Sequence, residues 1–156
     1  MFLHLAFYKA PGTWLNALVR RVTRSLYSHA ELVMDMGDGA RPPLCYSSDS
    51  RALGIVRFRR MALPSEAWDL VPVVVTPDEF RTVWAFTIRE EGSPYDLLGA
   101  LRFIVPWMPP SPTGWFCSDL IVSAFQRAGW WAGVEGWRTS PGALYKLVTA
   151  GVAHVG

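Results

Sequence analysis

The spacing of the apolar residues changes once along this chain, at Pro77, and this change constrains the fold more than any other feature. Before Pro77 the apolar residues lie in short segments typical of strands, at residues 2–8, 29–35, 44–48, 54–58 and 68–75. The connections between the middle strands are too short for crossover helices, so we expect an antiparallel meander there. After Pro77 the apolar residues recur at helical spacing, which predicts an α+β fold with an antiparallel sheet packed against helices.

The expected helices begin at residues typical of helix starts. Thr13 suits an N-cap, Pro77 suits the first helical position, and Ser140 is an N-cap residue followed by proline. In chain order, we expect helices over about residues 13–25, 77–88, 95–101, 117–128 and 140–149. In the first of these, Trp14, Leu18 and Val22 recur at spacings of four and therefore lie on one face.

The composition indicates a single globular domain over residues 1–156. Hydrophobic residues make up 51% of the chain and charged residues 18%, which is ample for a core and too apolar for a disordered chain. The longest uncharged stretch, 103–118, is interrupted by prolines and too short to span a bilayer, so no transmembrane segment is expected. The N-terminus lacks the features of a secretory signal, which predicts a protein that is cytoplasmic as synthesised. The net charge of +2 gives no argument for a nucleic-acid partner.

Cys117 lies where a proline-rich segment, residues 106–114, gives way to the amphipathic helix expected from residue 117. Free backbone N–H groups and the helix dipole favour negative charge there, so a thiol at that position should ionise more easily than a free one. The same N–H groups can bind the oxyanion of an acyl-transfer intermediate. The position predicts a nucleophile, whereas an ordinary cysteine would be a small buried hydrophobe.

A thiolate nucleophile needs a base, and the chain offers His4, His29 and His154. His4 lies among apolar residues of the first expected strand, and His154 lies close to the end of the chain. His29 opens an expected strand, from which a rigid sheet can direct its ring toward a helix terminus. We therefore expect His29 to pair with Cys117, although the two are far apart in the sequence.

Two segments resemble the NlpC/P60 cysteine peptidases, Ser-Pro-Tyr-Asp-Leu-Leu-Gly at 93–99 and Trp-Phe-Cys-Ser-Asp-Leu-Ile at 115–121. In the standard family the histidine follows the cysteine, whereas here it precedes it, in Ser-His-Ala-Glu-Leu-Val at 28–33. This order is similar to that of the circularly permuted branch, the YiiX/YaeF-like and lecithin:retinol-acyltransferase-like proteins. The segments Tyr-Ser-Ser at 46–48 and Gly-Ile-Val-Arg at 54–57 look like the next two strands of that branch. The resemblance, in particular to small prophage-type members, covers about residues 27–125 and implies a papain-like fold.

The resemblance also implies a third catalytic residue, a polar side chain that orients the imidazole from the strand after the histidine. By order this position falls on Ser47, with Ser48 next, although many members carry Glu or His there. Glu31 is the alternative, because two residues along a strand it shares a face with His29. Tyr95 matches the family tyrosine near the nucleophile and is a candidate for the substrate cleft.

Three further residues, Trp107, Trp115 and Cys45, complete the set of candidates. Trp107 and Trp115 flank the proline-rich segment and are candidates to line a substrate groove. Cys45 lies on an expected strand and should pack there rather than form a disulfide. A zinc site formed by His29, Cys45 and Cys117 would lack the ligand spacing of zinc motifs, so neither a metal nor a cofactor is expected.

These residues predict a cysteine hydrolase, a thiol protease or amidase with a papain-like mechanism that acts on a peptide or acyl substrate. The resemblance implies an amide bond in the peptide part of bacterial peptidoglycan, a cell-wall fragment being the expected partner. The alternatives are a lipid-directed acyltransferase or esterase of the same fold, and a non-catalytic binding module that uses the same groove. A wall hydrolase without a signal peptide would have to be delivered by a phage particle, a lysis system or a secretion machinery.

Overall fold

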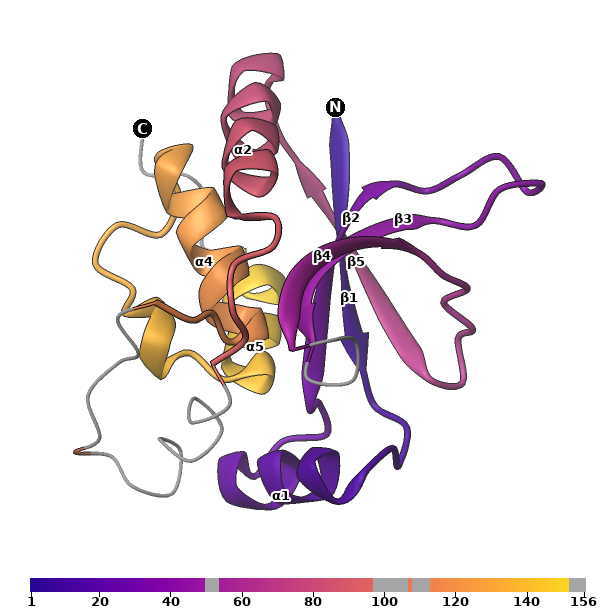
Figure 1. Ribbon diagram of the computed structural model, residues 1–156, viewed down its shortest axis with the longest axis vertical. Helices are drawn as coiled ribbons and strands as arrows, with labels where there is room; N and C mark the ends of the chain where they lie inside the picture. Colours follow the sequence, from indigo (N-terminus) through magenta and orange to yellow (C-terminus); the bar gives the residue numbers. More distant parts are fainter. Residues whose placement is uncertain (50–53, 97–106, 108–112, 152–156) are drawn as a thin grey trace.

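The computed structural model describes residues 1–49, 54–96, 107 and 113–151 (Figure 1). The strands are β1 (Phe2–Tyr8), β2 (His29–Asp35), β3 (Leu44–Asp49), β4 (Ile55–Arg60) and β5 (Trp68–Val74). The helices are α1 (Trp14–Thr23), α2 (Pro77–Glu90), α4 (Cys117–Arg127), the 3-10 helix η1 (Gly136–Arg138) and α5 (Pro141–Thr149). The predicted α+β class is confirmed, with an antiparallel five-stranded sheet and helices that mostly follow it in the sequence.

The sheet has the strand order β4-β3-β2-β1-β5, with all neighbours antiparallel. The predicted meander is therefore correct for β2, β3 and β4 but wrong for β5. That strand does not pair with β4 and instead pairs with β1, from Phe2 opposite Val74 to Tyr8 opposite Trp68. The segment between Arg60 and Trp68 is longer than a hairpin loop, so β5 can reach the free edge of β1. This places β2, which begins at His29, at the centre of the sheet.

Three helices, α2, α4 and α5, cover one face of the sheet, whereas α1 lies apart from them at one end (Figure 1). The main core lies between the sheet and α4, whose apolar face is buried as its spacing predicts. Its largest fully buried side chains come from both layers: Leu3, Leu5, Phe7, Leu32, Tyr46, Leu120, Ile121 and Phe125. Because α4 is fixed along its whole length by this core, its first residue has a defined position relative to the sheet.

The predicted helix starts are confirmed at three places. Thr13 caps α1 and Thr76 caps α2, each through a capping box, and Ser140 caps α5. The helix expected over 95–101 lies outside the described residues, apart from its first two positions. In the part of the chain that the structure describes, no helix is long and apolar enough to cross a membrane.

Candidate active site

Cys117 is the first residue of α4 and only 1% of its surface is exposed. The preceding residue, Phe116, is the N-cap and provides no side-chain hydrogen bond to the first turn. The backbone N–H groups of this turn therefore lack the usual cap, which leaves them suited to bind a negatively charged oxygen. The thiol and these donors lie together at the start of one helix, as the sequence predicts.

The backbone just before Cys117 is fixed to the edge of the sheet. Pro94 forms an antiparallel bridge with Ile55 of β4, and Tyr95 forms a parallel bridge with Trp115. The Trp115 carbonyl also accepts a hydrogen bond of 2.6 Å from the Ser48 hydroxyl on β3. These contacts attach the chain two residues before the thiol to β3 and β4, so the thiol is positioned by the sheet as well as by its helix.

His29 is the first residue of β2, and its ring lies between two partners. Its ring and the Cys117 side chain line the same cavity, and the sulfur is close enough to raise the pKa of the ring. Its Nε2 lies 3.0 Å from Oε1 of Glu31, two residues along the same strand. Since Nε2 is occupied by Glu31, the second ring nitrogen, Nδ1, remains for the sulfur. The predicted pairing of His29 with Cys117 is thus present in the structure.

Glu31 is itself held by Arg57 of β4. The two guanidinium nitrogens of Arg57 lie 3.1 and 3.0 Å from Oε2 and Oε1 of Glu31, a two-point ion pair. Only 1% of Glu31 and 9% of Arg57 is exposed. Four side chains, Cys117, His29, Glu31 and Arg57, therefore form one continuous buried chain of polar contacts. A charged guanidinium at its end fixes the carboxylate that in turn fixes the imidazole.

The electrostatics of the site favour a charged imidazole. Burial alone lowers the pKa of His29, but attraction to a negatively charged Cys117, a hydrogen bond with it, and then Glu31 outweigh the burial. Together they raise the pKa of His29 to about 10. Burial likewise favours the neutral form of Glu31, yet the contacts with His29 and Arg57 lower its pKa below the ordinary value. The contacts of the site therefore favour the imidazolium form of His29 beside an ionised Glu31.

The two serine candidates for the third position have other partners. The Ser47 hydroxyl donates to the Ala30 carbonyl at 2.7 Å, and Ser48 donates to Trp115. The contact with His29 is made by Glu31, the alternative candidate. Sequence reasoning did not identify Arg57. The available signal was the position of Arg57 between Val56 and Phe58 on an expected strand. An arginine on a strand can point into the protein, and a buried charge requires a partner of opposite charge.

Two cavities meet at His29. The smaller, of about 20 Å³, is lined by Cys117, His29 and Tyr95 together with residues of α1, including Asn16 and Val19. The larger, of about 210 Å³, is lined by His29, Glu31 and Arg57 with Tyr8, Arg59, Met61 and Trp68. Cys117 lines the smaller cavity and is not among the residues that line the larger one.

Of the aromatic candidates for the cleft, only Tyr95 lines a cavity beside the thiol. Trp115 directs its indole toward α2, where Nε1 donates to Oε2 of Glu90 at 3.0 Å. Trp107 is 82% exposed. The structure therefore brings Cys117, His29, Glu31 and Tyr95 together and places the two tryptophans away from the lining of this cavity.

A scan against protein-family models and a search of curated proteins found no match to this chain. The resemblance to the permuted NlpC/P60 branch thus stays a prediction, and the geometry of the site carries the argument about function.

Cys45 lies apart from this site. It packs with Ala6, Val33 and Trp68 in a small cluster, and burial raises the pKa of its thiol to about 12. Both Cys45 and Cys117 are free thiols. Within the described residues, no three side chains of the types that bind metals form a group.

Proposed function

We propose that this protein is a thiol hydrolase in which Cys117 is the nucleophile, His29 the acid and base, and Glu31 the residue that orients His29. The observation that carries the proposal is the buried chain of contacts from Cys117 through His29 and Glu31 to Arg57. Such a chain has a large desolvation cost, and an ordinary core position would be filled by apolar side chains instead. An imidazole between a thiol and a carboxylate is the arrangement that activates a cysteine nucleophile.

The reaction follows from these positions. The Cys117 thiolate attacks the carbonyl carbon of the substrate, and the N–H groups at the start of α4 bind the oxyanion. The imidazolium of His29 donates its proton to the leaving group, which departs and leaves a thioester on Cys117. Water then attacks the thioester while His29 accepts a proton from it, which releases the acid and restores the thiolate and imidazolium.

Glu31 gives the site a property that a serine in its place would lack. A hydroxyl can orient the imidazole, but it carries no charge to stabilise the imidazolium. The Glu31 carboxylate does both, and Arg57 keeps it ionised although it is buried. The proposed triad is therefore Cys117, His29 and Glu31, with Arg57 as a positioning residue.

For the family, we propose the circularly permuted NlpC/P60 branch, with a papain-like arrangement of helix and sheet. The support is the order of the residues, His29 on a strand before Cys117 at the start of a helix, together with the antiparallel sheet. The third residue departs from the family pattern, because Glu31 lies on the same strand as the histidine rather than on the next one.

The substrate proposed from this resemblance is an amide bond in the peptide part of peptidoglycan. A second candidate, an ester or acyl group of a lipid, is favoured by one specific observation. The helix beside the thiol, α1, carries the exposed Trp14 and Arg21 and ends at the exposed Arg24, a surface of the kind found on proteins that bind lipid interfaces.

Mass spectrometry of products tests the proposal. Wild-type protein, Cys117→Ala and Cys45→Ala are incubated separately with purified peptidoglycan and with phospholipid vesicles. We expect cleaved muropeptides from the wild type and from Cys45→Ala, and none from Cys117→Ala. Release of fatty acid with the same dependence on Cys117 selects the lipid candidate. No product from the wild type on either substrate would favour the non-catalytic binding module.

A further inference from the structure

The thiol is covered by α1 in this structure. Cys117 is 1% exposed, and the cavity that it lines has a volume of about 20 Å³, which is room for about one water molecule and not for a substrate. Leu15, Asn16 and Val19 of α1 form one side of this cavity. Because α1 forms this side of the cavity, an outward movement of α1 would open a path for a substrate carbonyl to the Cys117 sulfur. This step rests on the proposed function, in which Cys117 is the nucleophile.

Few groups attach α1 to the site. On its inner face, Val19 and Leu15 pack with Phe116 and Cys117. Asn16 Nδ2 and Arg20 Nη1 donate to the Ser28 hydroxyl at 3.0 and 3.4 Å. The rest of α1 stands apart from the sheet and the other helices (Figure 1). Elements with so few buried apolar contacts are those that open with the smallest free energy.

Both ends of α1 have backbone conformations suited to a pivot. Gly12, just before the N-cap, has φ of 63°. Arg24, the C-cap, has φ of 48° and ψ of 43°, a left-handed conformation that is uncommon and strained for a residue with a side chain. A rotation of α1 about these two positions would leave the regular helix between them intact.

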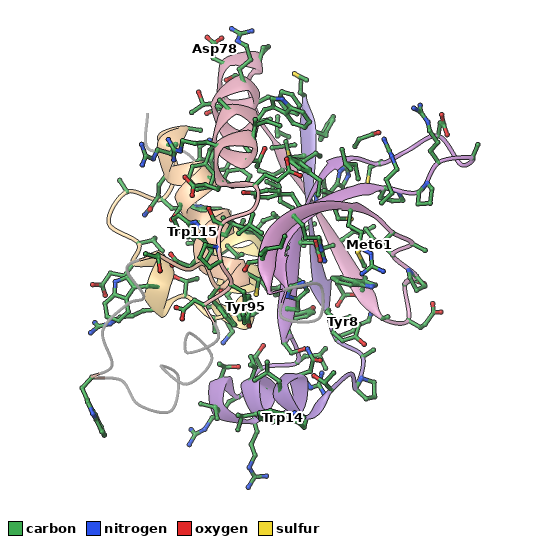
Figure 2. All side chains as sticks on the ribbon, in the orientation of Figure 1. Tyr8, Trp14, Met61, Asp78, Tyr95 and Trp115 are labelled. Carbon is green, nitrogen blue, oxygen red and sulfur yellow. The ribbon has the colours of Figure 1, made fainter. Side chains whose placement is uncertain are left out.

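The outer face of α1 is both apolar and basic. Trp14 is 77% exposed, and Leu18 and Val22, which follow it at spacings of four, are only half-buried. Trp14 lies at the opposite end of the molecule from Asp78 of α2 (Figure 2). The apolar face expected for this helix therefore begins, at Trp14, in solvent rather than in the core.

The charge on this face has one sign. Arg21 and Arg24 are exposed and form no ion pair among the described residues. The first acidic residue in the sequence is Glu31, which is buried at the site. A short helix with Trp and Leu beside unpaired Arg binds at a bilayer interface, where the apolar side chains enter the acyl boundary and the cations attract anionic headgroups.

We propose that α1 is a lid whose outer face binds an anionic membrane surface, and that this binding draws α1 away from Cys117. The inner face holds the lid closed through Asn16 and Val19. Insertion of Trp14 and attraction of Arg21 and Arg24 to the headgroups stabilise the open position. The membrane binds the open lid better than the closed one, because only in the open position can Trp14, Leu18 and Val22 all move from water into the bilayer interface.

The test measures access to Cys117 without any turnover. In a Cys45→Ala background, the rate of iodoacetamide modification of Cys117 is followed with vesicles of diether phosphatidylcholine, alone or mixed with diether phosphatidylglycerol. Diether lipids have no carboxylic ester that the thiol could attack. Cys117 therefore cannot become acylated by the vesicles, a reaction that would also block iodoacetamide and look like a closed lid. Sedimentation with the same vesicles gives the affinity. We expect the mixed vesicles to bind the protein and to accelerate modification, and pure phosphatidylcholine to do neither.

Variants on the two faces of α1 should act in opposite directions. Trp14→Ser should abolish the acceleration, and Arg21→Glu and Arg24→Glu should each weaken binding at least about fivefold. Asn16→Ala should accelerate modification without vesicles, because it removes one of the inner hydrogen bonds. Ile88→Ser and Arg81→Glu, matched changes of exposed residues on α2, should leave binding and acceleration unchanged.

Three outcomes would overturn the proposal. The first is binding to mixed vesicles with no change in modification rate, which would leave α1 a docking surface but no lid. The second is equal acceleration by the soluble polyanion heparin together with insensitivity to Trp14→Ser, which would point to a polymer rather than a bilayer. The third is no binding to mixed vesicles. If mixed vesicles accelerate modification of Cys117 but the protein hydrolyses neither peptidoglycan nor phospholipid, the proposed function alone is contradicted.

Discussion

Nε2 of His29 lies 3.0 Å from Oε1 of Glu31 although the two residues are separated by one residue on the same strand. Side chains two apart on a strand share a face and stand side by side, which ordinarily disfavours an end-to-end contact. Here His29 is the first residue of β2, so its ring can lean along the strand. The contact leaves Nδ1 for the sulfur of Cys117, while Arg57 binds both oxygens of Glu31 from the other side.

This relationship predicts the effect of changes at the third position of the triad. Glu31→Gln removes the charge that stabilises the imidazolium and should lower turnover about 10²-fold, within the range for acid–base groups. Ser47→Ala removes a hydrogen bond to the Ala30 carbonyl and should cost about 1 kcal/mol of stability with turnover nearly unchanged. Steady-state kinetics and denaturant unfolding of both variants measure the two effects.

A second variant keeps this comparison interpretable. Glu31→Gln leaves the buried guanidinium of Arg57 without its carboxylate, which can cost about 3–5 kcal/mol and unfold the protein. The double variant Glu31→Gln with Arg57→Met removes the unpaired charge and should recover stability but not turnover. If Ser47→Ala were the more damaging change for turnover, the orienting role would belong to Ser47.

The raised pKa of His29 predicts how stability depends on alkaline pH. The pKa is about 10 in the folded protein and 6.5 for an ordinary histidine. The stabilisation is therefore fully present below about pH 6.5 and is lost as the pH rises through about 10, by on the order of a few kcal/mol. The difference in unfolding free energy between the wild type and His29→Gln, measured from pH 6 to about pH 10, isolates this contribution.

The cause of the raised pKa can be tested in the same way. The negative charge on Cys117 is the largest influence that raises the pKa of His29. In Cys117→Ser this influence is absent, so the loss of stability should be smaller in total and complete at a lower pH than in the wild type. Identical profiles for the two proteins would mean that the sulfur does not interact with the imidazole.

Much of the fold could be predicted from the sequence because its signals are local. Strands β1 and β2 have the predicted bounds, and Thr13 and Ser140 cap helices where expected, since alternation and capping depend on neighbouring residues. The place of β5 beside β1 was not predicted, because strand order depends on which edge the chain reaches after a loop. Arg57 was missed for a related reason: its partner lies on β2, and only the register of the sheet brings them together.

The packing of Cys45 predicts a purely structural role for this residue. Cys45→Ala removes one buried sulfur from the cluster with Ala6, Val33 and Trp68, and should cost about 1–2 kcal/mol of stability, mainly through the cavity left behind. Turnover should stay unchanged, because Cys45 belongs to a separate cluster from Cys117. Denaturant unfolding and a turnover assay measure the two effects. A fall in turnover with the fold intact would show that Cys45 takes part in the site.

The last prediction concerns the reactivity of Cys117 and decides whether the contact with His29 is functional. An imidazolium beside the sulfur stabilises negative charge on it, so Cys117 should react with an alkylating reagent faster than the same thiol without the imidazolium. At pH 6, His29→Ala should therefore slow modification of Cys117 by iodoacetamide at least about tenfold. Burial under α1 slows the reagent in both proteins, and loss of the His29 ring from the cavity can only widen access, so a slower rate in His29→Ala reports loss of the ion pair and not of access. A rate that rises only near pH 8.5 in both proteins would identify an ordinary thiol, and the groove would then be better explained as a binding site without catalysis.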